Sequence, residues 1–126
     1  MIRRLALGVL LGLSLSAPAL GAPEDGRKVF LLHKCNLCHV VSPAENPLPL
    51  TEDEKKRIAQ GEVILIPPNL SDVGLRRDKE FLAKFLRQKT ELEGRLHQQR
   101  FEGTKEDFFL LIDWLLTLKT PPIHKQ

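Results

Sequence analysis

The chain has 126 residues, 19 of them basic and 16 acidic, and 42% of its residues are hydrophobic. Because positive and negative charges nearly balance, the composition argues against a general binder of nucleic acids or of membrane surfaces. This length allows one small domain with a limited hydrophobic core, and in such domains a metal or cofactor often completes the fold.

The first 22 residues have the composition of a secretory signal peptide. Arg3 and Arg4 precede an apolar run from Leu5 to Leu15, and small residues follow up to Ala22. Without Arg3 and Arg4, the 19 basic residues fall to 17 against 16 acidic ones, a net charge of +1. We therefore predict a signal peptide over residues 1–22, one domain over residues 23–126, and export to the periplasm.

An uncleaved membrane anchor is the alternative interpretation of this segment. The apolar run is short for a membrane span and is followed by the helix-breaking Pro18, so removal is favoured. The small residues leave the cleavage site open between Ala19 and Ala22. After removal, no stable membrane insertion is expected.

The next segment is predicted to form a helix. Between Asp25 and Lys34, the apolar residues 29–32 stand among polar ones, and Asp25 can cap the helix start. The predicted helix leads directly into a pair of cysteines.

The motif Cys35-Asn36-Leu37-Cys38-His39 is typical of covalent haem attachment. Two thiols at this spacing can add to the two vinyl groups on one edge of a haem, and the adjacent histidine can reach the iron. A redox-active dithiol needs no histidine there, and a zinc site needs two further ligands, which no second cysteine pair supplies. We therefore predict one haem c, bound covalently through Cys35 and Cys38, with His39 as an iron ligand.

A long, mostly irregular segment follows the motif. Three prolines within residues 42–49 predict a loop. Thr51 and Glu54 form a capping-box pattern, which predicts a short helix ending near Gly61. The apolar run Val63–Ile66 is compatible with either a strand or a buried loop.

Two further helices are predicted, separated by a link over residues 88–102 that carries His97. Asp78 can cap the first, and Thr104 with Asp107 can open the second. In the first helix, four apolar residues recur at helical spacing and three basic ones face water: Phe81, Leu82, Phe85 and Leu86, with Lys79, Lys84 and Arg87. The last helix has a broad apolar face made of Phe108, Leu111, Ile112, Leu115 and Leu118. Since almost nothing is typical of a hairpin, we predict an all-α domain with long loops.

Eight basic residues gather in the second half of the chain. A solvated helix face is the favoured interpretation, and a docking patch for an acidic partner is the alternative. The residues are Arg76, Arg77, Lys79, Lys84, Arg87, Lys89, Arg95 and Arg100.

Several of these features resemble class I cytochrome c, in which the N- and C-terminal helices cross beside a covalently held haem. Gly26-Arg27-Lys28-Val29-Phe30 is similar to the family's Gly-x-x-x-Phe on the first helix. Trp114 stands where the family has an aromatic residue on the last helix. The resemblance implies the cytochrome c fold, with Gly26, Phe30, Leu111 and Trp114 at the helix crossing.

Pro67-Pro68-Asn69-Leu70 is similar to the family's Gly-Pro-x-Leu. By this resemblance, the Pro68 carbonyl accepts a hydrogen bond from His39 and fixes its tautomer, and Leu70 packs on the haem. Pro67 departs from the family's glycine, and the segment from Val40 to Ile66 is longer than in the short mitochondrial-type members. Such an insertion could shield a haem edge or present a partner surface.

The sixth iron ligand cannot be the methionine that most members of the family use. The only methionine is Met1, which lies in the predicted signal peptide. Counting back from Trp114, His97 stands at the position of the family's methionine. His97 is therefore the predicted second axial ligand.

Other groups are weaker candidates for this position. Lys89, Lys105 or an open site are the alternatives. His33 lies only two residues before Cys35, so it cannot easily reach the opposite haem face, and it is interpreted as exposed. His124 stands at the end of the chain, where residues often fray.

Two histidine ligands imply a one-electron carrier rather than an enzyme, because they fill the iron's coordination shell. The reduction potential should be lower than that of a histidine and methionine pair. Redox proteins that dock transiently are the expected partners, and the chain could be free or the small subunit of a larger periplasmic oxidoreductase. The alternative is a haem protein that binds or senses a gas at an open or displaceable sixth site.

Overall fold

The computed structural model describes residues 23–123, and all regular structure in this range is helical. The predicted signal peptide and His124 lie outside the described residues. The elements are α1 (Pro23–Leu32), the 3-10 turn η1 (Cys35–Leu37), α2 (Glu52–Ala59), α3 (Val73–Arg76), α4 (Lys79–Leu86) and α5 (Lys105–Thr117). Over this range the predicted all-α class with long loops is confirmed, and the only β-type pairing is an isolated bridge between Leu92 and Arg95. No helix in this range has the length and hydropathy of a membrane span.

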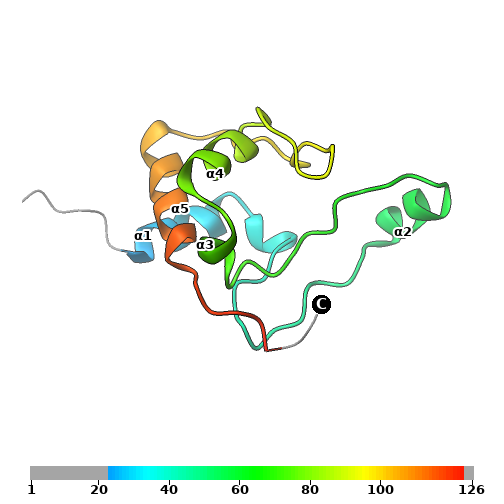
Figure 1. The fold of residues 1–126 in the computed structure, drawn as a ribbon, viewed down its shortest axis with the longest axis horizontal. Coiled ribbons are helices and arrows are strands. Elements are labelled where there is room, and N and C mark those ends of the chain that lie inside the picture. Colours follow the sequence, from blue (N-terminus) through cyan, green and yellow to red (C-terminus); the bar gives the residue numbers. More distant parts are fainter. Residues whose placement is uncertain (1–22, 124–126) are drawn as a thin grey trace, which may run out of the picture.

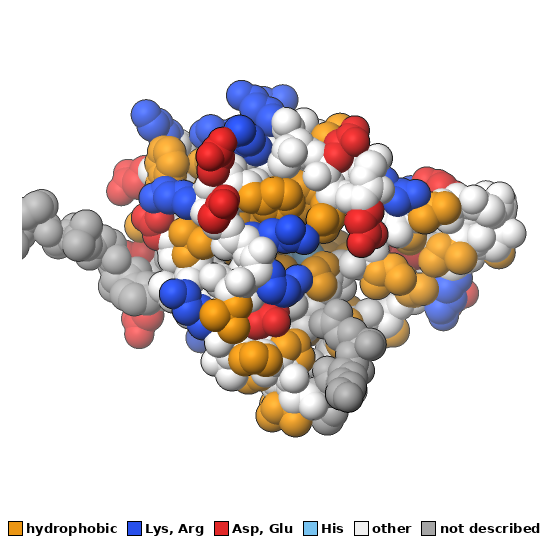
Figure 2. Space-filling model, viewed as in Figure 1, with side chains coloured by type: hydrophobic (Ala, Val, Ile, Leu, Met, Phe, Trp, Pro, Cys, Tyr) orange, Lys and Arg blue, Asp and Glu red, His pale blue; other side chains and the backbone are white. Residues whose placement is uncertain are grey.

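The helices form one body from which α2 projects. In this body α1, α3 and α4 all contact α5 (Figure 1). By contrast, α2 lies at the far end of a long loop and buries none of its residues. We call residues 43–66 the α2 arm. Ile58, Val63 and Ile66 of this arm are exposed. Figure 2 shows hydrophobic side chains at the surface in this part of the molecule.

The crossing of α1 and α5 depends on a glycine. A Cβ atom at position 26 would lie 2.1 Å from Trp114 Cβ and 2.3 Å from the Leu110 carbonyl oxygen, so a side chain has no room there. The rings of Phe30 and Trp114 pack with centroids 5.3 Å apart, and Leu111 is buried in the same core. The four residues expected at the helix crossing are therefore found there.

Helix α5 provides most of the hydrophobic core. Four of the five predicted apolar positions on this helix are buried, whereas Leu118 lies just beyond the helix end and is half-buried. The buried α5 side chains are Phe108, Leu111, Ile112, Trp114 and Leu115. They pack against Val29 and Phe30 of α1, Val73 of α3 and Leu82 of α4.

Three predicted helix starts are confirmed by hydrogen bonds. Thr51, Asp78 and Thr104 each accept a bond from a backbone N–H three residues further along. Thr51 and Glu54 form a complete capping box. The α2 helix ends before Gly61, whose φ of 84° is a left-handed conformation that glycine adopts without strain.

Two predictions about the first helix are wrong. Asp25 is not the cap, because α1 begins at Pro23, and proline suits a first helical turn where its missing N–H would have no partner. The helix also ends at Leu32 rather than Lys34, because Lys34 takes a left-handed φ of 57°.

The middle of the chain differs from the prediction in two places. Residues 63–66 form neither a strand nor a buried loop, since they have no strand partner and Val63 and Ile66 are 65% and 58% exposed. The short helix α3 was not predicted. The loop over residues 42–49 is confirmed as irregular.

Candidate functional site

The cysteine motif lies in a tight turn at the end of α1. Lys34 reverses the chain, and the His39 N–H then donates to the Cys35 carbonyl at 2.9 Å. Both thiols are free, with Cys35 half-buried and Cys38 exposed. Burial raises the pKa of the Cys35 thiol, so this group stays protonated at neutral pH. The turn presents both thiols and His39 within five residues.

The His39 ring is oriented by a backbone carbonyl. Its Nδ1 lies 2.9 Å from the Pro68 carbonyl oxygen, and because a carbonyl can only accept, Nδ1 must carry the proton. Burial lowers the pKa of His39; the Pro68 hydrogen bond opposes this, and the nearby His97 adds to it. The ring therefore stays neutral at physiological pH, with its Nε2 lone pair free to bind a metal. The hydrogen bond implied by the resemblance is present.

Pro68 is held in place by its neighbour Asn69, which is fully buried. The Asn69 Nδ2 donates to the carbonyls of Ser42 and Glu45 at 2.9 Å each, and its Oδ1 accepts from the Ser71 N–H. The loop after the cysteine motif is thus fastened to the segment that orients His39. Sequence reasoning did not identify this role, and the only available signal was a polar residue inside an otherwise apolar Pro-Pro-x-Leu stretch.

Leu70 is partly buried against the hydrophobic core, and its N–H donates to the Val40 carbonyl at 2.9 Å. Val40 directly follows His39 in sequence. Leu70 is therefore close to the histidine that it was predicted to accompany, and its contact with a haem stays a prediction.

His97 is oriented in the same way as His39. Its Nδ1 donates to the Gln99 carbonyl at 2.5 Å, which leaves Nε2 free. The Gln88 side chain donates to the His97 carbonyl at 2.7 Å, and the Phe85 ring lies edge-on at a centroid distance of 5.2 Å. The link over residues 88–102 therefore holds the His97 ring in a defined orientation.

The rings of His39 and His97 lie close together and nearly parallel, although 58 positions separate them in sequence. Their ring planes lie within 8° of parallel, and their centroids are 6.2 Å apart. Two imidazoles bound from opposite sides to one metal ion, with bonds of about 2 Å, place their centroids about 6 Å apart. Because both rings also have Nε2 free, the pair fits two axial ligands of one haem iron.

Three exposed apolar side chains directly precede residues of the candidate site in the sequence. Leu37, Ile66 and Leu96 are 68%, 58% and 44% exposed. They directly precede Cys38, Pro67 and His97. An apolar macrocycle bound between the histidines would find apolar neighbours in these side chains.

The alternative ligands have different surroundings. Lys89 and Lys105 are exposed, and His33 is half-buried against the Phe101 ring at a centroid distance of 4.5 Å, rather than fully exposed as predicted. Ligation by either lysine stays an alternative. Within residues 23–123, no three His, Cys, Asp or Glu side chains gather closely enough to hold a metal ion as a zinc site does. A haem iron needs only two axial ligands from the chain.

The basic residues between positions 76 and 100 lie on α3, on α4 and in the segments that follow these helices. Lys79 and Lys84 are exposed on α4, as predicted, and pair with Asp113 and Glu80. Arg87 differs, because its guanidinium is half-buried and lies 3.9 Å from the centroid of the Phe108 ring. Part of this basic stretch therefore has a structural role.

Comparisons with protein families, with curated proteins and with solved structures found no match for this chain.

Proposed function

We propose that this chain is an exported monohaem c-type cytochrome with the class I fold, and that it carries single electrons. The main support is the relation between His39 and His97, whose parallel rings lie 6.2 Å apart with both Nδ1 atoms on backbone carbonyls. The Cys35-x-x-Cys38 spacing directly before His39 supports covalent attachment of the same haem.

Different residues would hold different parts of the haem. Cys35 and Cys38 would form the two thioethers, and His39 and His97 would bind the iron axially. Pro68 holds the His39 tautomer by its carbonyl, and Leu70 adds an apolar contact. The crossing of α1 and α5 at Gly26 and Trp114 belongs to the proposed class I fold.

When bound, haem iron supplies a reversible one-electron couple. The chain would contribute the imidazoles of His39 and His97, whose Nδ1 atoms are held by backbone carbonyls, so little rearrangement would accompany transfer. Two histidines also favour a lower potential than a histidine and methionine pair. If His39 and His97 both hold the iron, the chain alone would offer a substrate no place on it, so we propose a carrier rather than an enzyme.

The proposed cellular setting rests on the composition of residues 1–22 and on the chemistry of haem attachment. Haem attachment to such a motif takes place outside the cytoplasm in bacteria, which agrees with the signal peptide proposed for residues 1–22. The partners would be redox proteins that dock transiently, either on a free carrier or within a larger periplasmic oxidoreductase.

The test is spectroscopic. The holoprotein, matured in a bacterial periplasm, and its His97→Ala variant are compared by optical and low-temperature EPR spectra, and carbon monoxide is added to both after reduction. We expect the unmodified protein to be low-spin and inert toward carbon monoxide, while the variant turns high-spin and binds the gas. An unmodified protein that is high-spin and binds the gas would contradict the proposal and favour gas binding or sensing.

A further inference from the structure

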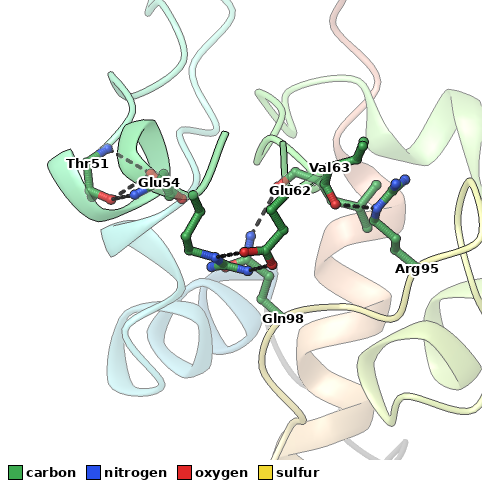
Figure 3. A network of polar contacts seen from close by, with 8 residues as sticks. Thr51, Glu54, Glu62, Val63, Arg95 and Gln98 are labelled. Carbon is green, nitrogen blue, oxygen red and sulfur yellow. Dashed lines mark hydrogen bonds and ion pairs between the residues drawn. The ribbon is translucent and has the colours of Figure 1, made fainter. Parts of the chain in front are cut away.

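One segment accepts hydrogen bonds from His39 and from two residues beside His97. We call residues 63–68 the strap. Three of its backbone carbonyls accept hydrogen bonds from side chains rather than from a paired strand: Val63 from Arg95 Nε at 2.6 Å, Leu65 from Gln98 Nε2 at 3.1 Å, and Pro68 from His39 Nδ1 at 2.9 Å. Figure 3 shows the Arg95 contact with Val63, and Gln98 beside it.

Two of these donors, Arg95 and Gln98, lie on either side of His97 in the sequence. Arg95 stands two residues before His97, and Gln98 directly follows it. On the other side of the same loop, Gln88 donates to the His97 carbonyl. Hydrogen bonds therefore hold the loop before and after His97, and those from Arg95 and Gln98 are made to the strap.

The strap is anchored at its end, where the buried Asn69 fixes the chain to the carbonyls of Ser42 and Glu45. At its start it continues from the α2 arm, in which Arg57 and Glu62 form a two-pronged ion pair with N to O distances of 2.9 and 2.5 Å (Figure 3). The strap therefore connects the carbonyl that orients His39 with the loop that carries His97.

We propose that the strap positions both axial ligands, and that Arg95 and Gln98 are positioning residues that keep His97 on the iron. This inference rests on the proposed function and assigns a role to the insertion between Val40 and Ile66. Without the two side-chain donors, the His97 loop gains freedom, so the population in which His97 has left the iron should rise.

The experiment removes the two donors and replaces them with unbranched apolar side chains. The Arg95→Met/Gln98→Met double variant is compared with Gln60→Met/Arg100→Met, which removes the same two residue types at exposed positions. Within residues 23–123, neither the Gln60 nor the Arg100 side chain donates to the strap. Both holoproteins, the unmodified protein and His97→Ala are reduced, and the rate of carbon monoxide binding is measured.

We expect the Arg95→Met/Gln98→Met variant to bind carbon monoxide roughly 10- to 100-fold faster than the unmodified protein, because two hydrogen bonds to the strap are lost. The control variant should behave as the unmodified protein. Weak high-spin EPR signals should appear in the first variant alone. If that variant yields no holoprotein, the single variants decide, each with a rise of about three- to tenfold.

The outcomes separate the two proposals. If the unmodified protein already binds the gas readily, ligation by two histidines is wrong and the strap proposal falls with it. If the unmodified protein resists and His97→Ala binds, yet the strap variant matches its control, the ligation stands and the strap proposal is wrong.

Discussion

The buried Asn69 side chain accepts a hydrogen bond from the Ser71 N–H at 2.9 Å, whereas the Ser71 hydroxyl, also buried, makes none. The two side chains lie in the same short turn, yet only one of them is satisfied. This difference gives a pair of matched substitutions with opposite expected effects.

Asn69→Ala should lower the free energy of unfolding by about 2 to 4 kcal/mol, because it leaves the buried Ser71 N–H and two partly buried carbonyls without a partner. Ser71→Ala should be neutral or stabilise by up to about 1 kcal/mol, since it removes an unpaired buried hydroxyl. Denaturant unfolding of the two holoproteins measures both values. Equal losses would show that Asn69 does not fasten the loop.

Gly26→Ala should destabilise the holoprotein by more than about 3 kcal/mol, although alanine favours helices by about 1 kcal/mol. The atoms in the way are the Trp114 Cβ and a backbone oxygen, which cannot move without separating α1 from α5. Gly61→Ala is the control, because open space surrounds position 61 and only its φ of 84° is unfavourable, at a cost of about 1 kcal/mol. Thermal unfolding distinguishes the two variants, and a small loss for Gly26→Ala would argue against the close crossing.

The local features of this fold were predictable because their causes are local. Thr51, Asp78 and Thr104 each satisfy a backbone N–H three residues away, so the pattern is visible in a short stretch of sequence. The geometry of His39 and Pro68 was predictable by resemblance alone, since nothing in the residues themselves links positions 29 apart.

The strap was not predictable. Arg95 and Gln98 donate to backbone carbonyls more than 30 residues away, and a carbonyl is present at every position, so such contacts leave no pattern in the sequence. Gly74 is a similar case. A Cβ there would lie 2.3 Å from the Leu116 carbonyl oxygen, and only the packing of α3 against α5 explains the glycine.

Glu93→Asn should raise the free energy of unfolding by about 0.5 to 1 kcal/mol. Glu93 and Gly94 have φ values of 53° and 74° in a two-residue turn closed by Leu92 and Arg95, and asparagine tolerates this conformation better than glutamate. Gly94→Ala should cost about 1 kcal/mol for the same reason. Thermal unfolding measures both changes, and opposite signs for the two variants are required.

The Arg57 and Glu62 pair gives a prediction about pH. The hydrogen bonds from Arg57, together with its charge, hold the pKa of the exposed Glu62 carboxyl below its ordinary value. Between the lowered pKa and the ordinary glutamate pKa, the unfolded chain therefore binds more protons than the folded one. The contribution of the pair to stability is present above the ordinary glutamate pKa and is lost as the pH falls through the lowered one.

Carboxyl NMR titration of the reduced holoprotein measures this pKa directly. Arg57→Met should return the Glu62 pKa to the ordinary range of glutamate, whereas Lys55→Met should leave it unchanged, because Lys55 pairs with Glu52 instead. Since Glu62 directly precedes the strap, the same titration can be followed at the Val63 amide, whose shift should move with Glu62 in the unmodified protein. An ordinary Glu62 pKa in the unmodified protein would mean that this ion pair does not form in solution.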